Sequence, residues 1–366
     1  MHPSPRLVYW ETTKRCNLRC AHCRAIPQTS ASPAELSLAE GFKLIDAIAE
    51  VGKPILVLTG GEPLLRHEIF DFATYGSWRK LPMALATNGT LVDREVAKEI
   101  VEAGFKRVSI SLDGPDSKTH DRFRRASGAF DKAVDGFIHL KELSMSMQVN
   151  TTVTTHNRER LGEIHQLVRK LGADAWHLFL LVPVGCGLEI TATAQLTPRD
   201  YEDVLYWIDE LAQTETMEVR ATCAPHAQRI RLQRQALTEA MGEGPEARGN
   251  LTIGPVPRAP SLSASQTRRG CLAGTGICFI SHRGEVFPCG YLPFKAGDIR
   301  LQSFRTIWET APIFSDLRDP DRLMGKCGAC EYRVVCGGCR ARAFGGRGHY
   351  LEEEPFCNYL PAPASS

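Results

Sequence analysis

Three cysteines near the start of the chain have a spacing that suits an iron–sulfur cluster. They stand at Cys16, Cys20 and Cys23, directly after a short apolar stretch, residues 6–10. A structural zinc site normally has a fourth protein ligand, and a cluster that only carries electrons normally has four cysteines. Three thiolates on one short loop therefore predict a [4Fe–4S] cluster with one iron left open for a substrate or cosubstrate.

A second motif, Gly60-Gly61-Glu62-Pro63, follows the next apolar stretch. Together with the three-cysteine loop, it resembles the radical S-adenosylmethionine (SAM) superfamily. The resemblance implies that the open iron chelates SAM and that an electron from the cluster cleaves it. The 5′-deoxyadenosyl radical that results abstracts a hydrogen from the substrate. A chance cysteine cluster or a zinc knuckle is the alternative, and the glycine motif argues against it.

The same resemblance implies further SAM-binding residues. In the family, the segment matching residues 60–63 follows the SAM amino group, mostly through backbone carbonyls. An aromatic residue commonly packs near the adenine at the position of His22. Three polar residues at strand ends are expected to bind the ribose or the methionine carboxylate: Asn88, Ser111 and Asp113. Asn150, on the fifth strand, is expected to point inward. Ordinary turn chemistry explains the Asn-Gly and Asp-Gly pairs equally well.

Strand and helix patterns alternate up to about residue 220, which predicts an α/β fold. The expected strands are residues 7–12, 55–59, 83–87, 108–112, 148–153 and 177–183. They are almost continuously apolar, as is typical of parallel strands buried on both faces. A complete TIM barrel needs eight units, so we expect a partial (β/α)6 TIM-like barrel, which the radical SAM resemblance also implies. Chemistry is expected at the carboxyl ends of its strands.

Helix signals and composition divide the chain further. Ser37 with Glu40 forms a capping box, and Thr197-Pro198 begins a helix over residues 201–212. A weaker strand over residues 217–222 and a basic helix over 228–237 precede a linker rich in Gly, Pro, Arg and Ser at 242–269. We predict a radical SAM partial barrel at 1–220, a bridging region and linker at 221–270, and a cysteine-rich domain at 271–366.

Eight of the thirteen cysteines lie in the last hundred residues. In a chain without an export signal, such clustered spacings indicate metal ligands rather than disulfides. The region resembles the SPASM domain of many radical SAM enzymes, with one residue fewer in the last gap of its C-x2-C-x5-C-x3-C core. The resemblance implies two auxiliary [4Fe–4S] clusters. The ligands would be Cys271, Cys278, Cys289 and Cys339 for the first, and Cys327, Cys330, Cys336 and Cys357 for the second. A zinc ribbon formed by the C-x2-C pairs is the alternative.

Almost the whole chain resembles the haem synthases of the alternative haem pathway and their haem d1 relatives. Supporting runs include residues 178–185, 221–226 and 279–289. The resemblance implies that two propionates of iron-coproporphyrin III become vinyl groups, with loss of hydrogen, CO2 and one electron that an auxiliary cluster accepts. Arginine forks suit such a carboxylate-rich ligand. The arginines near predicted strand ends or after the sixth unit are Arg24, Arg122, Arg124, Arg125 and Arg229, and a solvated surface role is the alternative for each.

Three further residues are catalytic candidates. Cys186 and Cys223 belong to neither predicted cluster, and a thiol beside a radical site can donate a hydrogen atom, as in radical peptide epimerases. His226 is expected to meet the porphyrin iron or a propionate. The plainer interpretation is that the cysteines are inert packing residues and that His226 is structural.

Two other functions remain open, a peptide-modifying enzyme and a non-enzymatic electron carrier. Maturases that act on peptides often have a leader-binding domain, and only fifteen residues precede Cys16, which disfavours them. A carrier needs neither an open cluster nor a barrel. The expected electron donor is flavodoxin or ferredoxin. A net charge of +2 gives no case for nucleic acid, and no apolar stretch is long enough to cross a membrane. The thiolates indicate a reducing cytoplasm.

Overall fold

Short strands and longer helices alternate along the chain, as the pattern of apolar stretches predicts. The computed structural model describes residues 4–241 and 269–361. Its strands are β1 Leu7–Glu11, β2 Ile55–Thr59, β3 Met83–Thr87, β4 Arg107–Ser111, β5 Met147–Val153, β6 Ala175–Leu180, β7 Glu218–Thr222, β8 Ile277–Ile280, β9 Glu285–Phe287 and β10 Gly297–Asp298. Its helices are α1 Leu38–Val51, α2 Ile69–Trp78, α3 Arg94–Glu102, α4 Ser117–Arg124, α5 Ala129–Glu142, α6 Leu161–Lys170, α7 Thr191–Ala194, α8 Pro198–Thr214, α9 His226–Met241, α10 Phe304–Thr310, α11 Pro312–Arg318, α12 Gly325–Ala329 and α13 Arg340–Arg347.

The described strands form one sheet in the order β10-β9-β8-β1-β2-β3-β4-β5-β6-β7. The strands from β8 to β7 in this order are parallel, and β9 and β10 extend the edge as antiparallel strands. The mixed α/β fold with a parallel sheet is confirmed. Two more parallel strands join the six of the predicted barrel. The first is β7, which matches the weaker strand expected over residues 217–222 and pairs with β6, and the second is β8, which pairs with β1.

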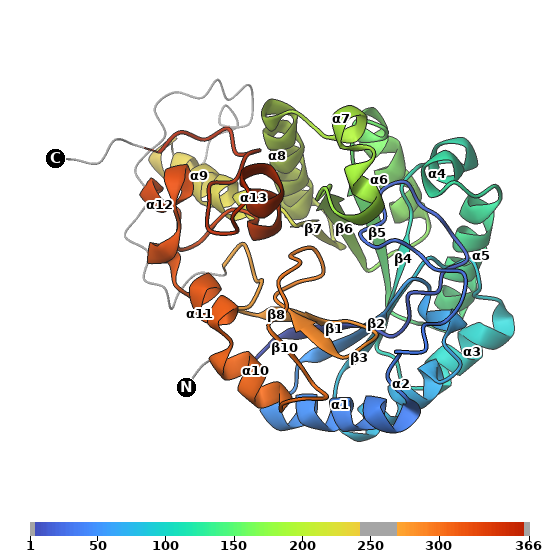
Figure 1. Cartoon of the computed structure of the whole chain (residues 1–366). Helices are drawn as coiled ribbons and strands as arrows, with labels where there is room; N and C mark the ends of the chain where they lie inside the picture. Colours follow the sequence, from blue (N-terminus) through green and yellow to red (C-terminus); the bar gives the residue numbers. More distant parts are fainter. Residues whose placement is uncertain (1–3, 242–268, 362–366) are drawn as a thin grey trace.

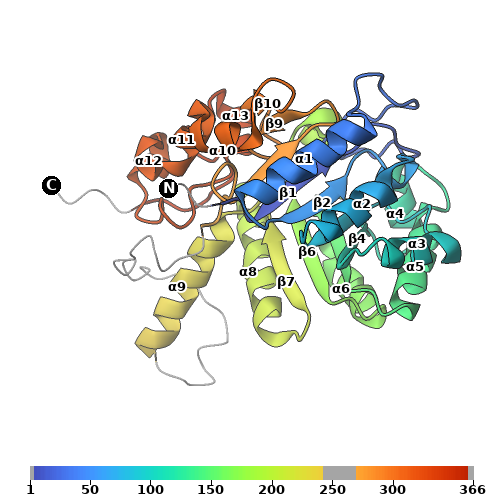
Figure 2. The same ribbon diagram turned by 90° about the horizontal axis from the view of Figure 1, so that it is seen from below.

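The pairing of β8 with β1 bears on the predicted domains. Strands from both sides of the predicted linker belong to one sheet, and the expected boundary after residue 220 falls inside β7. Nearly all of the predicted linker lies outside the described residues. In Figure 1 the helices α1 to α6 lie around the outside of the sheet, and the chain after β8, orange to red, fills the opposite side. Figure 2 shows the same arrangement from below.

Helix ends follow the predicted chemistry. The Ser37 hydroxyl accepts a hydrogen bond from the N–H of Glu40, and the Glu40 carboxylate accepts one from the N–H of Ser37. The capping box is therefore confirmed. Thr197 caps α8 as expected. The sixth strand begins two residues before the predicted start, because Ala175 pairs with Gln148 of β5. It ends at Leu180, three residues short of the predicted end at Pro183, which has no N–H to donate to a ladder.

Side chains alternate between a buried outer face and a more polar inner face of the sheet. Along β5, Gln148, Asn150 and Thr152 are half-buried, whereas the intervening residues are buried beneath the helices. Asn150 is paired with Ser111 on one side and with His177 on the other, and partners in a parallel register share a face. A polar row therefore crosses the inner face, as the inward position predicted for Asn150 requires.

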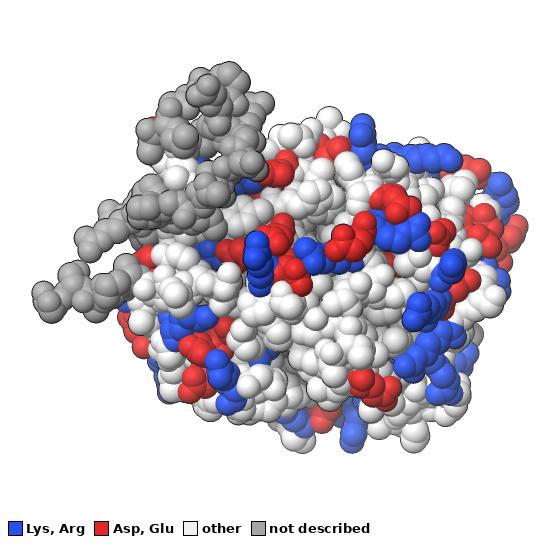
Figure 3. Space-filling model, turned by 90° about the horizontal axis from the view of Figure 1, so that it is seen from above, with Lys and Arg blue, Asp and Glu red and all other residues white. Residues whose placement is uncertain are grey.

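The surface carries both signs of charge. Figure 3 shows Lys and Arg interspersed with Asp and Glu over one face of the molecule. Among the described residues, no helix is both long and apolar enough to cross a membrane.

Candidate functional site

The glycine motif packs directly against the start of the cysteine loop. The N–H of Gly61 donates to the Thr13 carbonyl at 2.7 Å, and the N–H of Glu62 donates to the Arg15 carbonyl at 2.8 Å. A Cβ on Gly61 would lie 2.4 Å from the Arg15 oxygen, and one on Gly60 would lie 2.6 Å from the Thr13 oxygen. Only glycine allows the two backbones to approach so closely. The motif therefore fixes where the cysteine loop leaves β1.

The side chain of Glu62 is fully buried, and its hydrogen bonds are made within the protein. Its carboxylate accepts from the Thr87 hydroxyl at 2.7 Å, the Asn88 N–H at 2.8 Å and the Leu64 N–H at 3.1 Å. Desolvation raises the pKa of Glu62, and these hydrogen bonds oppose the rise. Pro63 begins the short turn that follows. The carboxylate thus ties the end of β2 to the end of β3.

Asn88 joins the end of β3 to the cysteine loop. Its amide donates to the Asn17 side-chain oxygen at 2.9 Å, and the Asn17 amide donates to the Thr90 hydroxyl at 2.8 Å. Sequence reasoning missed Asn17, although its position beside Cys16 was a signal. Ser111 ends β4, half-buried on the inner face beside Asn150.

Asp113 is the charged centre of the site. It is fully buried, and its carboxylate lies 2.6 Å from the Arg124 guanidinium and accepts from the Thr152 N–H at 2.7 Å. Desolvation alone would raise its pKa, but Arg124 above all and the neighbouring histidines hold it lower than usual. Arg124 also donates to the Cys20 sulfur at 3.6 Å. A positive charge therefore stands beside one predicted cluster ligand.

His22 lies against this pair, between the last two cysteines of the loop. Its ring stacks on Phe123 with 4.2 Å between centroids, and its Nε2 is 3.5 Å from the Asp113 carboxylate. Desolvation lowers the His22 pKa to about 3, so the ring is neutral. Its Nδ1 is buried without a hydrogen-bond partner. A buried orphan nitrogen on a flat ring suits a bound ligand with a complementary polar atom.

The cysteine loop has the donor set that a cluster requires. The Leu18 N–H donates to the Cys16 sulfur at 3.4 Å, and the Cys23 N–H closes the turn onto the Cys20 carbonyl. Desolvation, with smaller contributions from Glu62 and the other two thiolates, raises the Cys16 pKa to about 12. Metal binding must remove these protons, and N–H donors with a nearby arginine stabilise the sulfur charge that results. These residues fit a [4Fe–4S] cluster.

Cys186 lies beside this loop. It belongs to the short turn Gly185–Leu188 after β6, and its thiol donates to the Ala25 carbonyl at 3.3 Å. A Cβ on Gly185 would come within 2.4 Å of the Arg24 carbonyl oxygen. In Figure 1 the dark-blue loop after β1 accordingly meets the green segment after β6. Cys186 therefore lies at the carboxyl end of β6, beside the cysteine loop, and its catalytic role stays a prediction.

The four cysteines predicted for the second auxiliary cluster share one cavity of about 350 Å³. Its lining includes Cys327, Cys330, Cys336 and Cys357. His226 and Arg229 line it too, so His226 faces these sulfurs rather than the cysteine loop. His226 is buried, neither ring nitrogen has a hydrogen-bond partner, and desolvation lowers its pKa to about 3.

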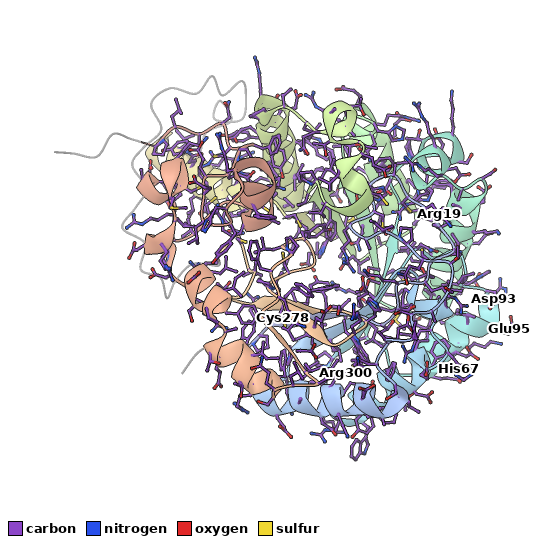
Figure 4. The ribbon with its side chains drawn as sticks, viewed as in Figure 1. Arg19, His67, Asp93, Glu95, Cys278 and Arg300 are labelled. Atoms are coloured by element: carbon purple, nitrogen blue, oxygen red, sulfur yellow. The ribbon has the colours of Figure 1, made fainter. Side chains whose placement is uncertain are left out.

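Of the four cysteines predicted for the first auxiliary cluster, the structure brings three together. Desolvation first, and then the charges of Cys271 and Cys339, raise the Cys289 pKa to about 12. Cys278 lies on β8 (Figure 4), where it is paired in register with Val8 of β1. Among the described residues, no three His, Cys, Asp or Glu side chains are close enough to share a single metal ion.

A buried ion pair that sequence reasoning missed stands beside Cys339. Arg342 and Glu354 are fully buried with 3.0 Å between them, and Glu354 accepts from the Cys339 N–H at 2.8 Å. Their places a few residues from Cys339 and Cys357 were the available signal.

Most of the arginines predicted to bind propionates form ion pairs within the protein. Arg24 binds Glu11, Arg124 binds Asp113, and Arg229 binds Glu202.

Comparison with known proteins places this geometry in a family. The model for the radical SAM superfamily matches residues 10–171, and the model for the SPASM iron–sulfur cluster-binding domain matches residues 271–331. An AdoMet-dependent heme synthase of Methanosarcina barkeri is 45% identical over 99% of this chain and 98% of its own length. One from Oleidesulfovibrio alaskensis is 43% identical over 98% and 88%. Pre-heme d1 synthase of Dinoroseobacter shibae is 31% identical over 98% and 87%.

Solved structures share the fold. SuiB of Streptococcus suis bound to S-adenosylmethionine superposes with a TM-score of 0.73 at 16% identity, covering 97% of this chain and 77% of SuiB. The enzyme anSMEcpe with AdoMet and a peptide gives 0.66 at 18%, covering 96% and 93%. The predicted [4Fe–4S] and SAM cofactors are confirmed at the level of the family. The chain belongs to the radical SAM superfamily, in the SPASM-containing group of the AdoMet-dependent heme synthases and pre-heme d1 synthase.

Proposed function

We propose that this radical SAM enzyme converts porphyrin propionates to vinyl groups, as the final oxidative decarboxylation of a haem pathway. The observation that carries the proposal is the 45% identity, over nearly the full length of both chains, to a protein named AdoMet-dependent heme synthase. When bound, the clusters and SAM supply the radical that takes one hydrogen atom and the acceptor for the one electron that leaves with CO2.

The chain's own residues bind and orient such a substrate. The row from Ser111 through Asn150 to His177 presents polar groups on the inner face of the sheet. Arg220, which is exposed, continues this row on β7, where its guanidinium pairs with Glu218. Asp113 and Arg124 hold the cysteine loop, so Cys20 stays in place as the substrate enters. His22 contributes a neutral ring beside the SAM position.

The cysteine sets support iron–sulfur clusters rather than zinc. The model for the SPASM iron–sulfur cluster-binding domain matches residues 271–331, which favours iron–sulfur clusters over zinc for the C-terminal cysteines. We therefore expect three four-iron clusters, or about twelve irons per chain. A low-potential donor of the flavodoxin or ferredoxin kind would reduce them, in the reducing cytoplasm that thiolate clusters need.

The test is anaerobic incubation of the reconstituted protein with iron-coproporphyrin III, SAM and a strong reductant. We expect 5′-deoxyadenosine to form together with porphyrin that has lost CO2 and two hydrogens from one and then from two propionates. Cys23→Ala is the control and should form neither product. If SAM is cleaved while the porphyrin keeps its mass and spectrum, the substrate proposal is rejected.

A peptide substrate is the second candidate, and the position of Cys186 favours it. Its thiol lies on the turn that packs on Cys23 and the following residue, where a hydrogen donor would act in an epimerase. The variant Cys186→Ala distinguishes a peptide-modifying function, which would need this hydrogen donor, from porphyrin decarboxylation. Loss of porphyrin conversion in this variant would not be expected, because decarboxylation does not return a hydrogen atom to the substrate.

A further inference from the structure

Cys278 lies on β8, and its direction follows from the pairing of β8 with β1. Cys278 is paired in register with Val8, and Phe279 is paired with Tyr9. Paired residues of parallel strands share a face, and successive residues alternate. Phe279 faces inward, because the Arg24 guanidinium lies 4.3 Å from its ring centroid. Cys278 therefore faces outward, on the side of Val8.

The surroundings of Cys278 agree with this direction. Trp10, on the same face as Val8, packs on Phe72 of α2 with 4.6 Å between ring centroids. The charged group that acts on Cys278 is Arg318, whose guanidinium lies over Trp308 of α10 at 4.6 Å. The Cys278 side chain is fully buried. It belongs to the packing between sheet and outer helices, away from the cysteines of the inner side.

Another cysteine lies where Cys278 was expected. Cys223 follows β7, and a Cβ on Gly270 would come within 2.8 Å of the carbonyl oxygen of Pro225, so the segment entering Cys271 packs on the segment leaving Cys223. The N–H of Cys271 in turn donates to the Cys336 carbonyl at 3.3 Å, which brings it to the loop before Cys339.

Contacts on its other side connect Cys223 to Cys339. The Tyr201 hydroxyl donates to the Cys223 carbonyl at 3.4 Å, and the Arg342 guanidinium lies over the Tyr201 ring at 4.9 Å. The Gly274 N–H donates to the Pro288 carbonyl at 3.2 Å, so the segment after Cys271 also packs on the residue before Cys289.

The backbone at Cys223 is also held in an unusual conformation. Its φ of +55° is left-handed, a region that residues with a side chain rarely adopt. Surrounding structure must hold such a residue in place, and conformations of this kind cluster at binding and active sites. The left-handed φ falls directly after the last residue of β7, Thr222.

We propose that Cys223, and not Cys278, is the fourth thiolate of the first auxiliary iron–sulfur cluster, with Cys271, Cys289 and Cys339. The predicted set changes by this one member. The assignment rests on the iron–sulfur cofactors of the proposed function but not on its porphyrin substrate. The test therefore needs no substrate, and failure of one proposal is distinguishable from failure of the other.

The experiment compares Cys223→Ala with Cys278→Ala in anaerobically reconstituted protein. Both changes remove one sulfur and keep the Cβ; Cys278 is fully buried and Cys223 is half-buried. We expect Cys223→Ala to lose about four irons and their sulfide per chain, the content of one cluster, while Cys278→Ala keeps the parent content. The spectroscopic response of the amino-terminal cluster to SAM reports that each variant is folded.

Cys223→Ser supplies a readout that a merely structural role would not change. An oxygen ligand should retain the cluster and shift the electron paramagnetic resonance of its reduced form, whereas Cys278→Ser should leave that spectrum as it is. Full iron in Cys223→Ala, or equal iron loss in Cys223→Ala and Cys278→Ala, would overturn the assignment. So would an unchanged spectrum in Cys223→Ser.

Discussion

The guanidinium of Arg124 and the carboxylate of Asp113 form a buried ion pair, with 2.6 Å between Nη2 and Oδ2. The same guanidinium lies 3.6 Å from the Cys20 sulfur. One arginine thus neutralises an acidic group at the end of β4 and stands beside a cluster ligand on the loop after β1. The pair joins two parts of the site that are far apart in sequence.

Arg124→Met should destabilise the protein and make its amino-terminal cluster harder to reduce. Loss of one partner leaves Asp113 as a buried unpaired charge, which costs about 3–5 kcal/mol. Loss of a positive charge near Cys20 should lower the midpoint potential, measured by redox titration under electron paramagnetic resonance. Arg122→Met, an exposed neighbour on the same helix, is the control. Adding Asp113→Asn should restore part of the stability, and no restoration would contradict this account of the pair.

Gly61→Ala should impair the assembly of the amino-terminal cluster while the rest of the fold persists. The added Cβ would meet the Arg15 carbonyl oxygen at 2.4 Å, so the cysteine loop must move. We expect lower iron content and a large loss of 5′-deoxyadenosine formation. Gly162→Ala, exposed on α6 with nothing near its Cβ, is the matched control and should stabilise the protein by about 0.5–1 kcal/mol. Equal activity in the two variants would show that the close approach is unimportant.

Glu62→Gln should lower the free energy of unfolding by about 1–3 kcal/mol, the cost of leaving buried hydrogen-bonding groups unsatisfied. The two carboxylate oxygens of Glu62 accept hydrogen bonds from the Thr87 hydroxyl and the Asn88 N–H. The side-chain amide of glutamine has only one oxygen that can accept, because its other end is an NH2 donor. Asn88 should then move away from Asn17, which raises the KM for SAM. Glu95→Gln on the outside of α3 (Figure 4) should change stability by at most about 1 kcal/mol. A Glu62→Gln protein as stable as this control would refute the role given to the carboxylate.

Local patterns in the sequence predicted most of the parallel strands and the motifs at their carboxyl ends. Continuous apolar strands, capping residues and the glycine motif depend on neighbours in the chain, so they can be read without the fold. The cysteine loop and Gly61 were found for that reason, and the structure places them against each other.

Features that depend on long-range pairing could not be predicted in this way. The pairing of β8 with β1 determines that Cys278 faces outward, and nothing near Cys278 in the sequence reports it. Likewise, Arg124 was considered as a propionate ligand, because its partner Asp113 is identified only when α4 folds back over the end of β4. The spacing of cysteines predicts that clusters form, whereas the fold decides which cysteines meet.

The protein should lose stability as the pH falls below about 6.5, in part because of His177 on the inner face of β6. Desolvation lowers the His177 pKa from 6.5 to about 4. Below pH 6.5 the His177 ring of the unfolded chain takes up a proton, whereas the folded ring takes it up only near pH 4. Proton binding therefore stabilises the unfolded state relative to the folded one. At pH 5.5 the loss is about 1.4 kcal/mol. His177→Gln should remove this part of the pH dependence, measured by anaerobic denaturant unfolding of the holoprotein between pH 7.5 and 5.5. An equal slope in His177→Gln and the parent would show that the folded His177 ring takes up its proton as readily as the unfolded one.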